Sequence, residues 1–280
     1  MMLLRIRKRR EKQKRRVVLK RAILAVSFGT SYRETREKTI GAIENALRGR
    51  FAGYEVRRAF TSRMIIKKLA ERDHIAVDTV AEAMERLVRE GFEEVIVQPT
   101  HVMNGYENED MLAQLERYRG CFRRFAVGEP LLSSGEDYRA LARALRAELP
   151  DPGEDGGVVL VGHGTDHPAN ASYAALAHYF TLEGMDKWTV GTVEGEPTAA
   201  DVRALLRRTG VRRVLLAPLL IVAGDHAVHD IFGKAPSWQA MLEEDGLEVT
   251  PVRRGLGEYE GVRELFVRHT DEARVRAERG

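Results

Sequence analysis

The sequence predicts an α/β fold of two similar lobes, each a four-stranded, mostly parallel sheet flanked by helices, with a cleft between the lobes. Two observations carry this prediction. Short β-branched runs alternate with longer amphipathic stretches along most of the chain, which is typical of βα units. The same order of motifs also occurs twice. With 280 residues, 44% of them hydrophobic, the chain can bury the core of one large domain or two small ones.

The first half contains the elements of one lobe. β-Branched and apolar runs bounded by turn residues predict strands at 22–27, 54–60, 93–98 and 122–127. Apolar residues that recur at helical spacing predict helices at 33–48, 63–71, 77–90, 107–119 and 136–148. Strands and helices alternate, so a parallel sheet is expected.

The second half contains the elements of the other lobe. Strands are predicted at 157–161, 187–193, 212–217 and 247–252, and helices at 169–181, 199–209, 236–244 and 258–275. Thr198 and Asp201 have the spacing of a capping box, which marks the start of the helix at 199. A linker is expected at 150–157, because this segment has two prolines, three glycines, three acids and no apolar residue. We therefore divide the chain into a basic arm at 1–21, an N-terminal lobe at 22–149 and a C-terminal lobe at 157–280.

The two halves repeat one another at their strands. An apolar run and a turn ending in Gly-Thr occur at 22–30 and again at 157–165. A second strand ends in Pro99 with Gly105 six residues later, and its counterpart ends in Pro218 with Gly224 six residues later. The repeat indicates two lobes of the same topology that close on a ligand.

Charge is unevenly distributed along the chain. Residues 1–21 hold eleven Lys or Arg against the single acid Glu11, a local net charge of +10, which leaves the body near −7. We interpret this run as a solvated, disordered arm. A polyanion-binding arm and a start codon assigned too far upstream are the alternatives. No membrane partner is expected, since no apolar run reaches about 18 to 20 residues. A nucleic-acid partner is not expected either, because the solvated arm is the preferred interpretation of the basic run. One cysteine, Cys121, fits a reducing compartment, so a cytoplasmic location is expected.

Three polar residues of the second half follow three successive predicted strands. His163 follows the first strand between two glycines, Glu194 follows the second, and His226 lies in the loop after the third. Ligand sites of parallel sheets open beyond the carboxyl ends of the strands, so these side chains are expected to share a site. Two imidazoles and one carboxylate suit Co, Ni, Fe or Zn and leave coordination positions open. Taken singly, each residue also has a structural explanation: a hydrogen-bonding turn histidine, a solvated loop acid, or the exposed start of a helix.

The first half lacks these groups at the matching positions. Phe28 stands where the second half has His163, Phe60 lies near the position of Glu194, and Glu107 stands near that of His226. The first lobe is therefore not expected to be a second metal centre. It retains His101, which could face the cleft from the opposite side and touch a substrate or bind a cofactor such as haem. The alternative is a hydrogen-bonded histidine at the edge of the core.

Four segments in this order resemble those of the anaerobic sirohydrochlorin cobaltochelatases, relatives of the ferrochelatases. They lie at 27–31, 161–165, 191–195 and 223–227, and the resemblance runs from about Ala22 to the end of the chain. It implies a class II chelatase fold and a lyase that inserts Co(II) into sirohydrochlorin or precorrin-2 without a nucleotide, in anaerobic cobalamin biosynthesis. It also implies that the metal is bound by His163, Glu194 and His226, and that His163 and Glu194 are catalytic. The arm before Arg21 has no counterpart in this pattern.

Other functions stay open at this point. Iron insertion, giving sirohaem, is the nearest alternative within the enzyme class, because the ligand set does not select cobalt over iron or nickel. A non-catalytic metal or haem carrier could use the same ligands, and a histidine phosphatase would need an arginine beside His163, where the sequence has glycines. A homo-oligomer is equally compatible with the pattern.

Overall fold

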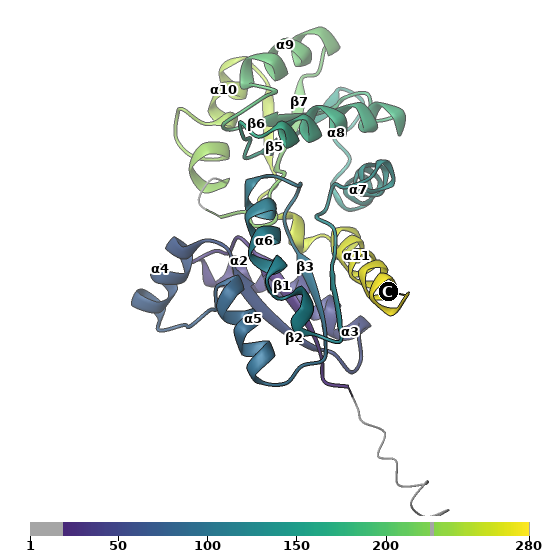
Figure 1. Cartoon of the computed structure of the whole chain (residues 1–280). Helices are drawn as coiled ribbons and strands as arrows, with labels where there is room; N and C mark the ends of the chain where they lie inside the picture. Colours follow the sequence, from purple (N-terminus) through teal and green to yellow (C-terminus); the bar gives the residue numbers. More distant parts are fainter. Residues whose placement is uncertain (1–18, 225–226, 280) are drawn as a thin grey trace, which may run out of the picture.

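Two four-stranded parallel sheets form the framework of the protein, as the sequence predicts (Figure 1). The computed structural model describes residues 19–224 and 227–279. The first sheet has the order β2-β1-β3-β4 and the second the order β6-β5-β7-β8, with every pair parallel. The strands are β1 (Arg21–Ser27), β2 (Glu55–Phe60), β3 (Glu94–Pro99), β4 (Arg124–Val127), β5 (Gly156–Gly162), β6 (Trp188–Thr192), β7 (Arg213–Pro218) and β8 (Glu248–Pro251).

Helices connect the strands and cover the sheets. They are α2 (Arg33–Lys38), α3 (Ile40–Arg50), α4 (Arg63–Asp73), α5 (Val80–Arg89), α6 (Tyr106–Glu116), α7 (Gly135–Glu148), α8 (Ala171–Leu182), α9 (Ala199–Thr209), α10 (Trp238–Glu244) and α11 (Glu260–Arg279). Short turns of helix lie at η1 (Arg119–Cys121), η2 (Pro168–Asn170), η3 (Ala227–Ile231) and η4 (Leu256–Glu258). The capping box predicted at Thr198 and Asp201 is present at the start of α9.

The predicted helix at 33–48 is interrupted at Thr39. This residue ends α2 and caps α3, and its hydroxyl donates to the carbonyl of Thr35 at 2.6 Å. The cause lies far away in the sequence, because the turn that contains Gly257 packs directly against the break. A Cβ on Gly257 would lie 2.9 Å from the Cα of Thr39. Local periodicity therefore could not reveal the interruption.

The register of the strands confirms the internal repeat. Val26 of β1 pairs with Pro99 of β3, and Val161 of β5 pairs with Pro218 of β7, at equivalent positions of the two sheets. Both first strands end in a turn with a left-handed glycine, Gly29 at φ 102° and Gly164 at φ 87°. The lobes thus present equivalent edges, formed by the carboxyl ends of their strands.

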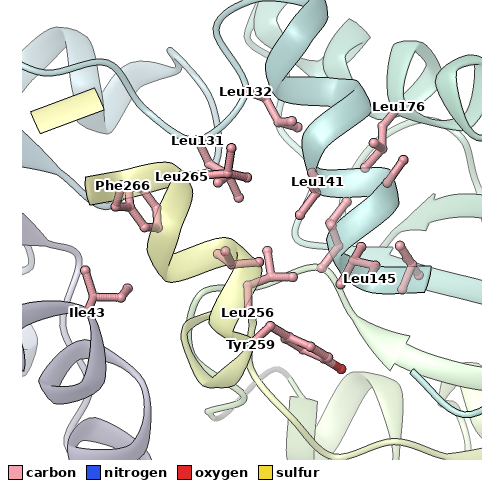
Figure 2. Packing of buried hydrophobic residues seen from close by; sticks show 14 of the residues in the cluster. Ile43, Leu131, Leu132, Leu141, Leu145, Leu176, Leu256, Tyr259, Leu265 and Phe266 are labelled. Atoms are coloured by element: carbon pink, nitrogen blue, oxygen red, sulfur yellow. The ribbon is translucent and has the colours of Figure 1, made fainter. Parts of the chain in front are cut away.

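The last helix of the chain packs on the first lobe. α11 contacts α3, β3 and β4 of the first lobe and also α7, while α7 itself packs against α8 of the second lobe. Figure 2 shows Leu265 and Phe266 of α11 among the buried side chains, with Ile43 of α3 to one side and Leu141 of α7 to the other. One apolar cluster therefore runs through both lobes. The last helix of the first half, α7, packs against α8 of the second lobe, and α11 of the second half packs on the first lobe.

A buried polar group fixes α11 to α7. His269 is 2% exposed, and its Nε2 lies 2.8 Å from Asp137 Oδ1 while its Nδ1 lies 3.1 Å from the carbonyl oxygen of Glu129. Both ring nitrogens of His269 therefore have a polar partner. Arg268 also pairs with Asp137. Burial raises the pKa of Asp137, but the hydrogen bonds from His269 and Ser134 outweigh it and lower this pKa below its ordinary value.

In the described part of the chain, no helix is both long and apolar enough to span a bilayer. Most of the predicted basic arm lies outside the described residues, and β1 begins at Arg21.

Candidate metal centre

His163 and Glu194 lie next to each other at the carboxyl edge of the second sheet. β5 ends at Gly162 and β6 at Thr192, and these two residues form the last pair between the strands. The pairing continues beyond the strands, because the backbone N–H of Glu194 donates to the carbonyl of His163 at 2.7 Å. The sequence predicted that these residues share a site, and their main chains are in direct contact.

Two glycines allow the chain to turn at His163. A Cβ on Gly162 would lie 2.2 Å from the ring of Tyr173, which is buried beneath the turn. At Gly164 the backbone is left-handed, and a Cβ would lie 2.6 Å from the carbonyl carbon of Glu194. A side chain at Gly162 would therefore displace the ring of Tyr173, and one at Gly164 would force the two strand ends apart.

The ring orientation of His163 follows from its backbone contact. Nδ1 lies 2.9 Å from the carbonyl oxygen of Gly164, which can only accept, so the proton is on Nδ1. The lone pair of the neutral ring is then on Nε2, the atom through which such a histidine binds a metal ion. The side chain is half-buried. The turn thus fixes the tautomer that metal binding requires.

Two residues that the sequence analysis missed hold the turn in place. The side-chain oxygen of Asn170 accepts the N–H of Thr165 at 3.1 Å, and its amide nitrogen donates to the carbonyl of Glu196 at 2.8 Å. Asn170 therefore joins the loop after β5 to the loop after β6. The hydroxyl of Tyr173 accepts the N–H of Gly164 at 3.2 Å, and burial raises the pKa of this tyrosine. Both residues sit within ten positions of His163, but no sequence motif marks them.

The third predicted ligand, His226, lies outside the described residues. The segment that leads to it starts at the same sheet edge, because the N–H of Leu219 donates to the carbonyl of Val161 at 2.7 Å. Beyond it, the N–H of Val228 donates to the carbonyl of Gly224 at 3.1 Å. Residues 19–224 and 227–279 contain no group of three or more His, Cys, Asp or Glu side chains able to hold a metal ion. A three-ligand centre therefore depends on His226.

The first lobe has Phe28 and Ser62 at the positions of His163 and Glu194. The N–H of Ser62 donates to the carbonyl of Phe28 at 3.2 Å, which matches the bond between Glu194 and His163. Phe60, predicted to lie near the position of Glu194, lies two residues before it, because Phe60 pairs with Ser27 as Thr192 pairs with Gly162. Phe28 is 48% exposed. Neither Phe28 nor Ser62 offers an imidazole or a carboxylate. The first lobe therefore lacks the metal ligands predicted for the second lobe.

His101 is half-buried at the end of β3 in the first lobe. Its Nδ1 lies 3.4 Å from Asn108 Oδ1, and Asn108 is oriented by a hydrogen bond to Asn104. Its Nε2 is shielded from solvent and has no hydrogen-bond partner within the described residues. Burial lowers the pKa of His101, which favours the neutral ring. The alternative of a fully hydrogen-bonded core histidine therefore does not hold.

Comparison with known families decides the class of the protein. Residues 21–275 match the model of the family described as cobalt chelatase (CbiK). The chain belongs to the cobalt chelatase family. It is 41% identical over 256 residues to the sirohydrochlorin cobaltochelatase of Salmonella typhimurium, which covers 91% of this chain and 97% of that protein. It is 38% identical over 255 residues to the sirohydrochlorin cobaltochelatase CbiKC of Nitratidesulfovibrio vulgaris, covering 89% of each chain. Cobalt is accordingly the substrate metal of this family.

Solved structures agree with the fold of this cobalt chelatase family member. SirB from Bacillus subtilis superposes with a TM-score of 0.63 over 93% of this chain and 98% of that chain, at 16% identity. CbiX, described as the terminal enzyme of sirohaem biosynthesis in denitrifying bacteria, superposes with a TM-score of 0.55 over 90% of this chain and 99% of that chain, at 17% identity. At such low identity, the likeness supports the chelatase fold alone.

A hollow elsewhere in the second lobe is unrelated to this edge. It has a volume of 530 Å³ and is lined by residues that include Arg146, Pro150, Met185 and Trp188. Trp188 begins β6, whereas Glu194 follows its end, so the hollow opens at the opposite edge of the sheet.

Proposed function

We propose that the protein inserts Co(II) into sirohydrochlorin, the reaction named for its relatives, without a nucleotide and as a step of anaerobic cobalamin biosynthesis. The observation that carries this proposal is the contact between His163 and Glu194 at the carboxyl edge of the second sheet. It brings the main chains of a histidine and a glutamate into direct contact at a turn where glycines allow the close approach. Their spacing from His226 along three neighbouring strands supports a three-ligand site.

The reaction requires that the ion lose water while two pyrrole N–H protons leave the macrocycle. An open set of two imidazoles and one carboxylate binds the substrate ion weakly enough to release it. In this proposal Nε2 of His163, the carboxylate of Glu194 and His226 hold Co(II). Glu194 also accepts one pyrrole proton as the ion passes to the macrocycle, and the second proton passes to water. His163 and Glu194 are thus the catalytic residues.

His101 contributes from the first lobe in the same proposal. Its unpartnered Nε2 can accept a hydrogen bond from a substrate group that reaches the end of β3. The same lone pair could bind a haem iron, and that role stays a prediction. The contacts of Nδ1 with Asn108 give the ring a fixed orientation in either case.

Anaerobic absorbance spectroscopy tests the proposal. The purified protein is mixed with sirohydrochlorin and Co(II), Fe(II) or Ni(II), and formation of the metallated macrocycle is followed. We expect turnover with Co(II), and a loss of at least about tenfold in His163→Ala and in Glu194→Ala, the low end for a positioned acid–base group. His178→Ala and Glu243→Ala remove an exposed histidine and an exposed acid of the same lobe and should leave the rate unchanged. Binding of cobalt without turnover would instead indicate a carrier.

Two further proposals concern the cellular location and the oligomeric state of the protein. We propose that the chain works in the cytoplasm, and cell fractionation tests this. Homo-oligomerisation stays a prediction that analytical ultracentrifugation can check.

A further inference from the structure

A polar contact joins the two lobes close to the metal-binding turn. Nε2 of His167, in the loop after β5, lies 3.2 Å from Oε1 of Glu109 on α6 of the first lobe. The ring of Tyr106, the first residue of α6, meets the ring of His167 edge-on, with 4.7 Å between centroids and 79° between planes. One histidine of the second lobe therefore contacts two residues of the first turn of α6.

The hydrogen bonds of His167 determine which ring nitrogen donates to Glu109. Nδ1 accepts the backbone N–H of Ala169 at 3.0 Å, so Nδ1 carries no proton in this arrangement. The proton of the neutral ring is then on Nε2, which donates to the carboxylate of Glu109. The backbone N–H of His167 also donates to the hydroxyl of Thr165 at 3.1 Å. The loop thus presents His167 to α6 in one orientation and in one tautomer.

The position of this contact relates it to the candidate site. His167 follows His163 by four residues, and Tyr106 follows His101 by five. The contact therefore bridges the two loops that carry the candidate groups of the opposing lobes. It also fixes how far apart these loops lie.

The other contacts between the lobes are of a different kind. The apolar cluster that contains α7 and α11 runs through both lobes, and Val222 packs against Ile40, Phe60 and Leu69 of the first lobe. Such apolar contacts do not exchange readily with water. The side chain of Glu109 is 53% exposed and that of His167 is 12% exposed, so water can replace their hydrogen bond when the loops separate. The polar contact is the part of the interface best suited to open and close.

We propose that Glu109, His167 and Tyr106 form an interlobe latch that positions the loops around the bound macrocycle. This inference rests on the proposed function. A flat tetrapyrrole held between two lobes must meet the metal ligands on one lobe and the binding groups on the other at a fixed separation. The closed latch sets that separation, and its opening allows the macrocycle to enter and leave. The three residues are positioning residues and take no part in metal or proton transfer.

Substitutions at both ends of the hydrogen bond test the latch. Glu109→Ala removes the acceptor, whereas Glu109→Gln retains an acceptor oxygen at the same place. His167→Asn keeps a side-chain oxygen that can accept the N–H of Ala169 but is too short to reach Glu109. We expect Glu109→Ala and His167→Asn each to raise KM for sirohydrochlorin about tenfold, with kcat within about twofold of wild type. Glu109→Gln should restore most of the affinity.

A double variant and a matched control separate the latch from a general effect on α6. If the two residues act through one hydrogen bond, Glu109→Ala combined with His167→Asn raises KM no further than either change alone. Glu116→Ala removes another exposed acid of α6, whose ion pair is with Arg119, and should leave KM unchanged. Additive effects of the two latch substitutions, or an equal effect of Glu116→Ala, would overturn the proposal.

Binding of metal-free sirohydrochlorin, followed by quenching of intrinsic fluorescence, gives a second measurement that needs no cobalt insertion. The same variants should weaken this binding about tenfold. If wild-type protein binds the macrocycle but does not metallate it, the proposed function fails while the latch can still be measured. Wild-type affinity and wild-type KM in both Glu109→Ala and His167→Asn would refute the latch even if cobalt insertion proceeds.

Discussion

Replacing Gly164 by alanine should damage the fold and the site together, because this glycine lies between His163 and Glu194. Two costs can be separated. The left-handed backbone at φ 87° costs an alanine about 1–2 kcal/mol. The new Cβ would also lie 2.6 Å from the carbonyl carbon of Glu194 and 2.7 Å from the nitrogen of Gly195, and both atoms belong to the backbone. Relieving this overlap costs about 1–3 kcal/mol more.

Gly210→Ala isolates the first of these costs. Gly210 has a similar left-handed backbone, at φ 67°, and nothing lies within 4 Å of its missing Cβ. It ends α9, away from the metal centre. We therefore expect Gly164→Ala to lower the free energy of unfolding by about 2–5 kcal/mol and Gly210→Ala by about 1–2 kcal/mol, as measured by urea denaturation.

The two variants should differ more strongly in activity. Moving the backbone of Glu194 away from Gly164 lengthens the 2.7 Å bond to His163 and displaces two proposed metal ligands relative to each other. A displacement of this kind is expected to lower cobalt insertion at least about tenfold in Gly164→Ala. Gly210→Ala should insert cobalt at the wild-type rate. Equal stability of the two variants, together with full activity of Gly164→Ala, would refute the reasoning about this turn.

Three further predictions concern stability. Tyr173→Phe leaves the N–H of Gly164 without its acceptor and should lower the free energy of unfolding by about 1–3 kcal/mol in urea titrations; no loss would mean that water replaces the hydroxyl. Asp137→Asn removes the buried carboxylate that His269 and Arg268 contact and should cost about 3–5 kcal/mol by the same measurement, whereas a neutral result would contradict a stabilising role for this cluster. Hydrogen bonds from Arg143 and Arg139 lower the pKa of Glu183 to about 2 from 4.5. This carboxylate is depressed in the folded state, so its stabilisation is present above pH 4.5 and is lost as the pH falls toward about 2. Thermal melts should show a shallower acid dependence in Glu183→Gln, and an unchanged dependence would contradict the pairing.

The two four-stranded parallel sheets and the lobe repeat were accessible from the sequence because each strand is short, apolar and followed by a turn residue. His163 and Glu194 were accessible for a related reason, since both directly follow strands that pair in parallel. Because the two residues follow successive strands, we could infer that they lie close together at the carboxyl edge of the sheet. The same reasoning placed Phe60 only near the position of Glu194, because the sequence alone does not fix the register to the residue.

Other features depend on contacts that local patterns do not encode. The break at Thr39 arises from the turn at Gly257, more than 200 positions later in the chain. Asn170 joins two loops through its side-chain amide, and an asparagine in a loop has no distinguishing periodicity. The latch joins Glu109 to His167 across the lobes, and no sequence pattern relates two residues 58 positions apart. Such contacts become visible only when the tertiary arrangement is known.

The crossing of α11 onto the first sheet has a consequence for synthesis of the protein on the ribosome. Residues 260–279 contact β3 and β4, which are made well over a hundred residues earlier. Until residues 260–279 are made, one face of the amino-terminal sheet lacks its apolar cover and is open to aggregation or chaperone capture. A nascent chain that stalls before residue 260 should therefore be protease-sensitive in both halves, because α7 also loses the helix against which it packs.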